Sequence, residues 1–153
     1  MSEQPLTPSE VREKVLAQHR EIEQMLTELE QGVAQLQHGV ERAARVKRAA
    51  YAMRGILELH MTYEEKHLVP AISGADGFGP ERALHILNEH QEQRRKLDDI
   101  VSSILAAVSP EEIAQGIEQL ATALREDMQE EECNYVNALL LHDHLVPTDA
   151  FGR

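Results

Sequence analysis

The sequence predicts an all-α protein built as an up-down-up-down antiparallel four-helix bundle. Apolar residues recur at helical spacing in four long segments, the connections between them are mostly short, and no run alternates apolar and polar residues as a strand would. A chain of 153 residues is long enough to bury a core. We therefore expect one domain over residues 1–153, with helices at about 8–37, 40–68, 80–108 and 110–142.

The first two predicted helices are separated by a glycine. The segment TPSE is a capping box that places Pro8 at the first helical position, and apolar residues then recur at helical spacing as far as Leu36. Gly39 is expected to stop this helix. A second helical pattern, rich in Ala, Met and Leu, follows over residues 40–67. These two helices would form an antiparallel hairpin.

The last two predicted helices follow the one long loop in the sequence. Pro70 and the glycine-rich run SGADGFGP are expected to form this loop, and Pro80 suits the start of the third helix. The segment SPEE repeats the cap signature before the fourth helix. The tail VPTDAFGR is expected to be frayed or loosely docked.

Charge and cysteine content exclude several classes of partner. The formal net charge is -12, whereas binding to nucleic acid or to an anionic membrane is driven by basic surfaces, so we expect neither partner. The basic residues within 42–48 and 94–96 are expected to lie on solvated helix faces. A single cysteine, Cys133, excludes an intramolecular disulfide, and no apolar run reaches the length of a membrane span. These features lead us to expect a cytoplasmic protein.

The two halves of the chain carry related patterns. The pattern Leu-x-x-His-x6-Leu starts at Leu16 and again at Leu87. The pattern Leu-x-x-His-x-x-x-Glu-Glu starts at Leu57, and a version with Asp in place of His starts at Leu124. One helical hairpin is therefore predicted to be used twice.

Four polar residues fall at the same height in the predicted bundle. His19 and His60 each lie about 20 residues from the first turn, and His90 and Asp127 lie about 18 or 19 residues from the last turn. His60 and His90 are also each about 15 residues from the centre of the middle loop. Residues equally far from a turn lie level in an antiparallel hairpin, because each helical residue rises about 1.5 Å. Each helix thus supplies one polar residue to a common layer.

This layer has the composition of a metal site. One His or one His/Glu pair alone would be an ordinary surface or core feature, but Glu64 and Glu131 each follow a layer residue by four positions and lie on the same helix faces. Unpaired buried carboxylates would cost several kcal/mol each, and two divalent ions would offset them. Mixed nitrogen and oxygen ligands favour iron, with manganese or zinc less favoured. The predicted metal ligands are His19, His60, Glu64, His90, Asp127 and Glu131.

The same residues resemble the hemerythrin-like, or HHE cation-binding, family over essentially the whole chain. The family pattern has a His on the first helix, His-x-x-x-Glu on the second, a His on the third and a second His-x-x-x-Glu on the fourth. Here His19, HMTYEEKHLVP, NEHQEQ and DMQEEECNYV match these elements in order. The resemblance implies two non-haem iron ions joined by an oxo or hydroxo group. It also implies bridging by Glu64 and Glu131, one iron on His19 and His60, and the other on His90 and Asp127.

Asp127 departs from the family pattern, because it stands where the family has its fourth histidine. A carboxylate makes this position harder and more anionic, which favours the oxidised metal. Oxygen or another small oxidant is the expected partner. We expect sensing, iron handling or redox reactivity rather than the reversible oxygen carriage of His-rich members. Whether the protein is an enzyme stays open, and no catalytic residue is assigned.

Other polar residues lie near the layer. Glu23 and Arg94 each follow a layer histidine by four positions and are expected to form an ion pair. Tyr63 and Tyr135 are expected near the inner faces, to donate to a bridging carboxylate or to pack. His67, close to the loop, is expected to be exposed. The remaining histidines are expected on the surface, beyond reach of the layer: His38, His85, His142 and His144.

A second function stays open beside metal binding. The protein would then be a regulatory or scaffolding bundle that acts through protein contacts, with the metal structural or absent. The segment RAARVKRAAYAMRGIL, over residues 42–57, would be its docking face. A hydrolytic site is not expected, because the sequence contains neither a nucleophile motif nor a phosphate-binding loop.

Overall fold

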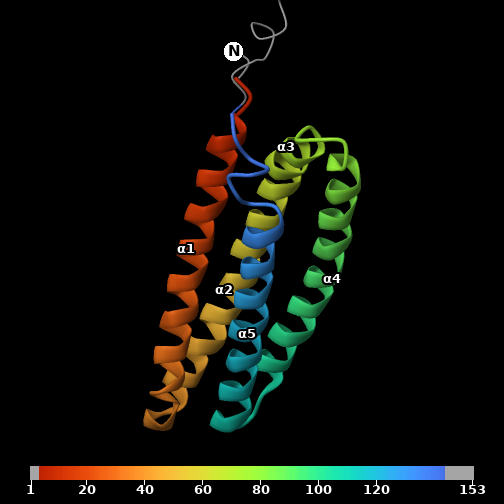
Figure 1. Cartoon of the computed structure of the whole chain (residues 1–153). Coiled ribbons are helices and arrows are strands. Elements are labelled where there is room, and N and C mark those ends of the chain that lie inside the picture. The colour runs from red at the N-terminus through yellow and green to blue at the C-terminus, as the bar shows by residue number, and fades with distance from the viewer. Residues whose placement is uncertain (1–3, 144–153) are drawn as a thin grey trace, which may run out of the picture.

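The chain forms a four-sided bundle of antiparallel helices. The structure is a computed structural model that describes residues 4–143, and no strand occurs among them. The long helices run alternately up and down (Figure 1): α1 (Pro8–Val33), α2 (Val40–Tyr63), α4 (Gly79–Ala106) and α5 (Pro110–Asn134). Helices α1 and α4 each pack against both α2 and α5. The predicted fold class is confirmed.

Two helix starts are capped as the sequence predicts. The Thr7 side chain accepts a hydrogen bond from the backbone N–H of Glu10, and the Glu10 carboxylate accepts one from the backbone of Thr7. At the start of α5, the Ser109 hydroxyl accepts from the backbone N–H of Glu112. These bonds satisfy amides that a helix terminus otherwise leaves unpaired, and they fix where α1 and α5 begin.

Two predicted helix ends are wrong. Helix α1 ends at Val33, and a 3-10 turn, η1 (Leu36–His38), leads to Gly39, whose φ of 138° favours glycine. Helix α5 ends at Asn134 rather than near 142. Side chains on a helix rotate by about 100° per residue, so a straight continuation would bury only some of the apolar residues that follow. Leaving the helix buries three of them: Tyr135, Val136 and Leu141.

The predicted loop at Pro70 is also wrong, because the chain stays helical through this proline. Helix α2 passes into a π-helical turn, η2 (Glu64–Leu68), and then directly into α3 (Val69–Ser73). The backbone N–H of Val69 bonds to the carbonyl of Glu64, one residue further back than in an α-helix. A proline inside an α-helix loses one hydrogen bond and clashes with the carbonyl four residues back. The wider π-helical turn ends at Leu68, two residues before Pro70, and changes the backbone geometry on which this clash depends.

The π-helical turn also keeps one side of the segment facing inwards. His60, Glu64, Leu68 and Ile72 are spaced by four residues, which in an α-helix would rotate each side chain about 40° past the one before. The π-helical turn contains one extra residue, which compensates for this rotation. Glu64, Leu68 and Ile72 are consequently all buried, with exposed fractions of 1%, 0% and 0%.

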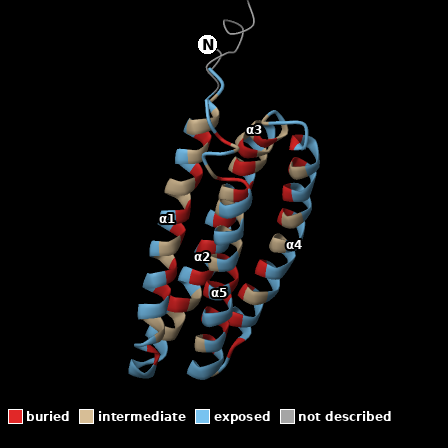
Figure 2. Cartoon of the chain, viewed as in Figure 1, coloured by how far each residue is buried: buried red, intermediate tan, exposed pale blue. Residues whose placement is uncertain are grey.

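The core consists of two apolar clusters. The larger cluster fills the end of the bundle where α1 meets α2 and α4 meets α5, and it includes Leu26, Met53 and Leu120. The smaller cluster lies at the α3 end, and it includes Val15 and Ile86. Figure 2 shows buried residues along the inner sides of the helices. In the sequence, each of four predicted ligands stands between residues of the larger and the smaller cluster: His19, Glu64, His90 and Glu131.

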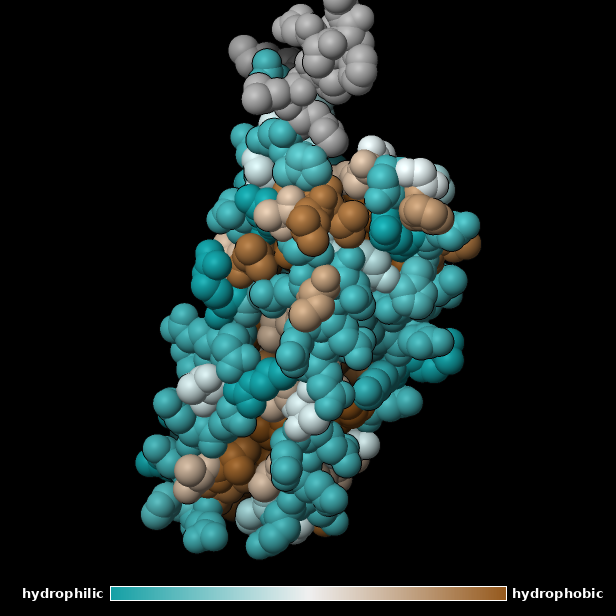
Figure 3. Space-filling model, in the orientation of Figure 1, coloured by the Kyte–Doolittle hydropathy of each residue, from teal (hydrophilic) through white to brown (hydrophobic). Residues whose placement is uncertain are grey.

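The outer surface is mainly polar. The face in Figure 3 is largely hydrophilic, with apolar side chains showing between helices and near the α3 end. Arg42, Arg45 and Arg48 are exposed as predicted, whereas Lys47 is partly buried and donates to the carbonyls of Leu105 and Ala107 where α4 ends. In the described part of the chain, no helix is long and apolar enough to cross a membrane.

Candidate metal centre

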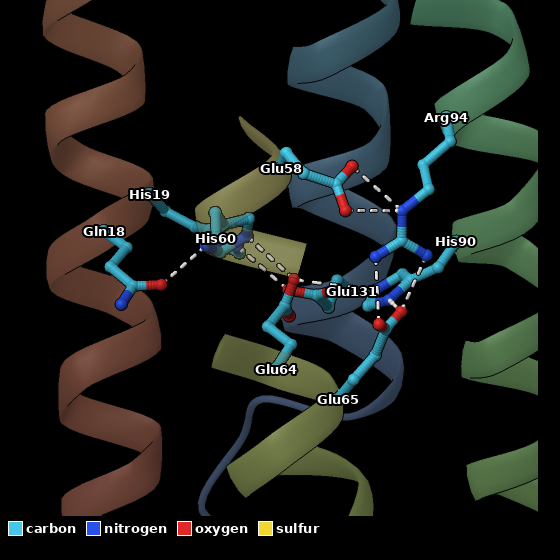
Figure 4. A network of polar contacts seen from close by, with 9 residues as sticks. All are labelled: Gln18, His19, Glu58, His60, Glu64, Glu65, His90, Arg94 and Glu131. Carbon is cyan, nitrogen blue, oxygen red and sulfur yellow. Dashed lines mark hydrogen bonds and ion pairs between the residues drawn. The ribbon is translucent and has the colours of Figure 1, made fainter. Parts of the chain in front are cut away.

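Four of the predicted ligands meet inside the bundle. His19 of α1, His60 of α2, Glu64 of η2 and Glu131 of α5 each offer one ligand atom, and these atoms lie within 4.8 Å of one another. His19 Nε2 is 2.9 Å from Glu131 Oε1, and His60 Nε2 is 2.8 Å from Glu64 Oε1. Figure 4 shows these side chains converging from three directions. The group could hold a metal ion.

The other two predicted ligands lie beside this group. His90 of α4 is buried, and its Nε2 is 3.6 Å from Glu64 Oε1. Asp127 of α5 is partly buried and lines the same cavity of about 30 Å³ as His19 and Glu131. Neither residue belongs to the four whose ligand atoms lie within 4.8 Å. The common height predicted for the layer is therefore observed, and the tightest cluster is on the α1, α2 and α5 side.

Each central histidine is held from outside by a residue that the sequence analysis missed. The Nδ1 atom of His60 lies 2.6 Å from Gln18 Oε1, which is seen at the edge of Figure 4. The Nδ1 atom of His19 lies 3.0 Å from Glu132 Oε2. Polar partners at the far nitrogen fix the ring orientation and tautomer of histidines that bind metals.

His90 is held in the same way. Its Nδ1 atom lies 2.9 Å from Glu65 Oε2. Gln18, Glu65 and Glu132 each stand next in sequence to a predicted ligand, and two of them complete the Glu-Glu doublets of the repeat. These doublets were the available sequence signal for the outer partners.

The histidine rings are oriented so that Nε2 atoms face carboxylates. An amide or carboxylate oxygen only accepts, so Nδ1 of His60 donates outwards, and a neutral ring then presents an Nε2 lone pair to Glu64. Two buried atoms at the centre, Glu64 Oε2 and His90 Nε2, have no hydrogen-bond partner among residues 4–143. Buried polar atoms are normally satisfied. A proton or a metal ion between the nitrogen and oxygen atoms resolves the arrangement, so the donor set fits a cation.

Crowding of the two central carboxyl groups shifts their pKa values. Burial, the charge of Glu64 and the hydrogen bond between the two carboxyl groups together raise the pKa of Glu131 to about 8. Burial raises the pKa of Glu64 to about 6, although the hydrogen bond with Glu131 and the charge of His19 oppose the shift. Without metal, one proton is therefore held near neutral pH, mainly by Glu131, and metal binding must displace it.

The other predicted ligands also have shifted pKa values. Burial lowers the pKa of His60 to about 4 and raises that of Asp127 to about 6. For His19, burial works against the charged form, but hydrogen bonds to Glu131 and Glu132 outweigh it and raise the pKa. A neutral His60 beside a cationic or metal-bound neighbour is the form that can offer a lone pair.

The predicted ion pair between Glu23 and Arg94 is wrong. Glu23 accepts from Arg125, with Arg125 Nη2 at 2.8 Å from Glu23 Oε1. Arg94 is not part of a solvated basic face either, because its guanidinium bonds to Glu65 and Glu58. The i+4 spacing placed both residues next to the layer, but the bundle puts different helices beside them.

The remaining aromatic and histidine residues lie outside the cluster. Tyr63 is partly buried, and its buried hydroxyl has no hydrogen-bond partner in the part of the chain that the structure describes. Its ring lies 4.6 Å from that of His67. His67 is therefore partly buried rather than exposed. Tyr135 packs in the smaller core cluster. His38, His85 and His142 are exposed as predicted, and His144 lies outside the described residues.

Fold and site together define a helical bundle with a buried histidine and carboxylate cluster suited to a cation. A family model described as the hemerythrin HHE cation binding domain matches residues 11–139. The chain belongs to this family. The match covers all six predicted ligands and confirms the resemblance seen in the sequence. No curated protein and no solved structure matches the chain.

Proposed function

We propose that the protein binds two non-haem iron ions and that this centre interacts with oxygen or a small oxidant. Sensing, iron handling or redox reactivity fits better than reversible oxygen carriage. The observation that carries the proposal is a pair of buried atoms, Glu64 Oε2 and His90 Nε2, that have no hydrogen-bond partner among the described residues. They lie at a point where two further Nε2 atoms face carboxylates. Four mutually close donors support one position, and His90 with Asp127 supports a second.

The two positions would share the glutamates. His19 and His60 would hold the first ion, and His90 and Asp127 the second, with Glu64 and Glu131 between them. His19, Glu64 and His90 are only 5%, 1% and 1% exposed, so the site excludes most water. Nitrogen and oxygen donors of this kind suit iron better than zinc, and iron would supply one-electron chemistry.

The protein contributes orientation and restricted access. Gln18, Glu65 and Glu132 hold the outer nitrogens of the three histidines, so each Nε2 stays directed at the centre. A cavity of about 30 Å³ beside the donors has room for a group about as large as one water molecule. A small oxidant is therefore the size of partner that this site admits.

Asp127 is the reason to favour oxidant chemistry over carriage. It lines the cavity where the family pattern has a histidine, and burial raises its pKa to about 6. A carboxylate there adds negative charge to the second position and favours the oxidised metal. Reversible oxygen carriage, by contrast, needs a reduced metal centre that persists in air.

Two matched substitutions test metal binding. His60→Ala removes a histidine whose Nε2 is 2.8 Å from the carboxylate four residues on, and His85→Ala removes an exposed histidine with the same 2.8 Å contact to Glu89. Protein from iron-rich medium should contain about two iron per chain in the unaltered and His85→Ala forms, and less in His60→Ala. Iron content and the near-ultraviolet absorption after air exposure are the measurements. Equal iron in both variants, or none in the unaltered chain even after anaerobic addition of Fe(II), would count against the proposal.

A scaffolding role is the second candidate, and one observation favours it. Helix α2 leaves Tyr51 and Leu59 exposed at 59% and 72%, on a segment that also carries exposed arginines. If a cellular partner is found and its binding survives His60→Ala, the interaction and not the metal carries the function. We propose a cytoplasmic location on the sequence evidence of a single cysteine.

A further inference from the structure

The two halves of the centre repeat the same outer contact. Glu132 of α5 lies 3.0 Å from Nδ1 of His19, and Glu65 of η2 lies 2.9 Å from Nδ1 of His90. These four residues occupy equivalent positions in the two halves of the sequence repeat. The repeat is therefore visible in the contacts as well as in the spacing.

The two halves differ at the position four residues after the histidine. Arg94 follows His90 by four positions, whereas Glu23 follows His19 by four positions. Arg94 Nη1 donates to Glu65 Oε2 and Arg94 Nη2 donates to Glu65 Oε1, both at 2.9 Å. Glu65 Oε2 is the same oxygen that faces Nδ1 of His90, as Figure 4 shows. The arginine thus bonds directly to the group that holds the histidine.

Glu132 has no equivalent support. Among residues 4–143, no lysine or arginine forms an ion pair with it, and its side chain is 43% exposed. Glu65 is 27% exposed, and Arg94 is anchored again through Nε to Glu58 at 3.0 Å. A network of ion pairs therefore runs from the surface residue Glu58 to the buried ring of His90.

We propose that Arg94 is a positioning residue, which acts through Glu65 to hold Nδ1–H of His90 outwards and Nε2 towards the centre. This inference rests on the proposed metal function and specifies how the second metal position is kept ready. Without Arg94, the partly exposed carboxylate of Glu65 can turn into water. The 1% exposed ring of His90 would then lose the only hydrogen-bond partner that its Nδ1 has in the described part of the chain.

The planar fork of arginine is needed for this role. Two parallel N–H groups bind both oxygens of Glu65 while Nε binds Glu58, and a lysine ammonium cannot reproduce these directions. Arg94→Lys should therefore restore only part of what Arg94→Gln removes. Arg125→Gln is the matched control, because Arg125 also binds two glutamates, Glu23 and Glu30, but within residues 4–143 neither of them forms an ion pair with a histidine.

The first measurement uses metal-free protein, so it does not depend on metal binding. A buried Nδ1–H held by a carboxylate exchanges slowly with water and gives a ring N–H resonance, which is assigned by its loss in His90→Gln. The resonance should be present in the unaltered chain and in Arg125→Gln, weakened in Arg94→Lys and absent in Arg94→Gln. Its persistence in Arg94→Gln would overturn the proposal.

The second measurement is the affinity for the first and second equivalents of Fe(II), obtained by anaerobic titration of the same variants. Loss of an outer hydrogen-bond partner typically weakens metal affinity by roughly 10–100-fold, so Arg94→Gln should weaken the second equivalent by this factor and leave the first nearly unchanged. Equal weakening of both equivalents, in both Arg94→Gln and Arg125→Gln, would show a general structural effect and overturn the proposal. If the unaltered chain binds no metal, the proposed function fails, whereas the resonance still decides the role of Arg94.

Discussion

Raising the pH from 6.5 to 8 should destabilise the metal-free protein. Burial and the adjacent Glu64 raise the pKa of Glu131 to about 8, from 4.5 for an ordinary glutamate. Between these values the folded chain holds a proton that the unfolded chain has lost, so the free energy of unfolding falls as pH rises. His19 acts in the same direction, because its pKa is raised above 6.5 in the folded chain despite burial.

The expected loss is on the order of 1–2 kcal/mol. One proton held only by the folded state changes stability by about 1.4 kcal/mol per pH unit, and this slope decreases as the pH approaches the folded pKa. Glu64 and Asp127, with pKa values of about 6, have lost most of their protons before this range begins. His60, with a pKa of about 4, is neutral in the folded chain throughout it.

Urea denaturation in the presence of a chelator measures this slope. Glu131→Gln cannot ionise and should flatten the dependence, whereas Glu118→Gln, at an exposed position on the same helix, should not change it. With excess metal, the free energy of unfolding should rise with pH instead of falling, because the metal replaces the protons and binds more tightly as they dissociate. Metal-free protein that is as stable at pH 8 as at pH 6.5, or a Glu131→Gln variant that keeps the full slope, would refute the reasoning.

Three further outcomes are expected. Gly79→Ala should destabilise the chain by about 1–3 kcal/mol or more in chemical denaturation, because the added Cβ would lie 2.3 Å from the carbonyl oxygen of Ser73. Gly55→Ala is the control: its added Cβ would have no atom within 4 Å, so this substitution should be neutral or stabilising. Asp127→His, which restores the histidine of the family pattern, should raise the reduction potential in a redox titration; an unchanged potential would place Asp127 away from the metal. Chelation should lower the melting temperature, because metal at 100 times its dissociation constant adds about 2.7 kcal/mol; no change on chelation would mean that metal does not bind the folded state.

The bundle and the height of the site were predictable from spacing alone. Helical rise is constant, so counting residues from the turns placed His19, His60 and His90 at one level, and the structure brings all three to the same centre. The errors at the helix ends did not change these counts, because α2 and α5 begin after Gly39 and Ser109, at the turns from which the residues were counted. Side-chain identity and register together were enough to predict that four of these residues lie close together: His19, His60, Glu64 and Glu131.

The outer contacts were not predictable in the same way. Which residue reaches Nδ1 of a histidine depends on how neighbouring helices are rotated, and the spacing within one helix does not report that rotation. Arg94 illustrates the point, since its i+4 relation to His90 was correct while its partner is Glu65 and not Glu23. The π-helical turn was missed because Pro70 is normally a sign that a helix ends.

The position of the polar layer between two apolar clusters has a consequence for cooperativity. Residues such as Leu26 and Leu120 stabilise one end of the bundle, and Val15 and Ile86 stabilise the other, with charged groups between them. Without metal, we expect this junction to be the weakest section of the core, so the α3 end should open locally while the larger cluster stays packed. A cation bound by α1, α2 and α5 would join the two ends into one unfolding unit. Local opening of the α3 end would then depend on metal occupancy, in addition to the near-ultraviolet absorption.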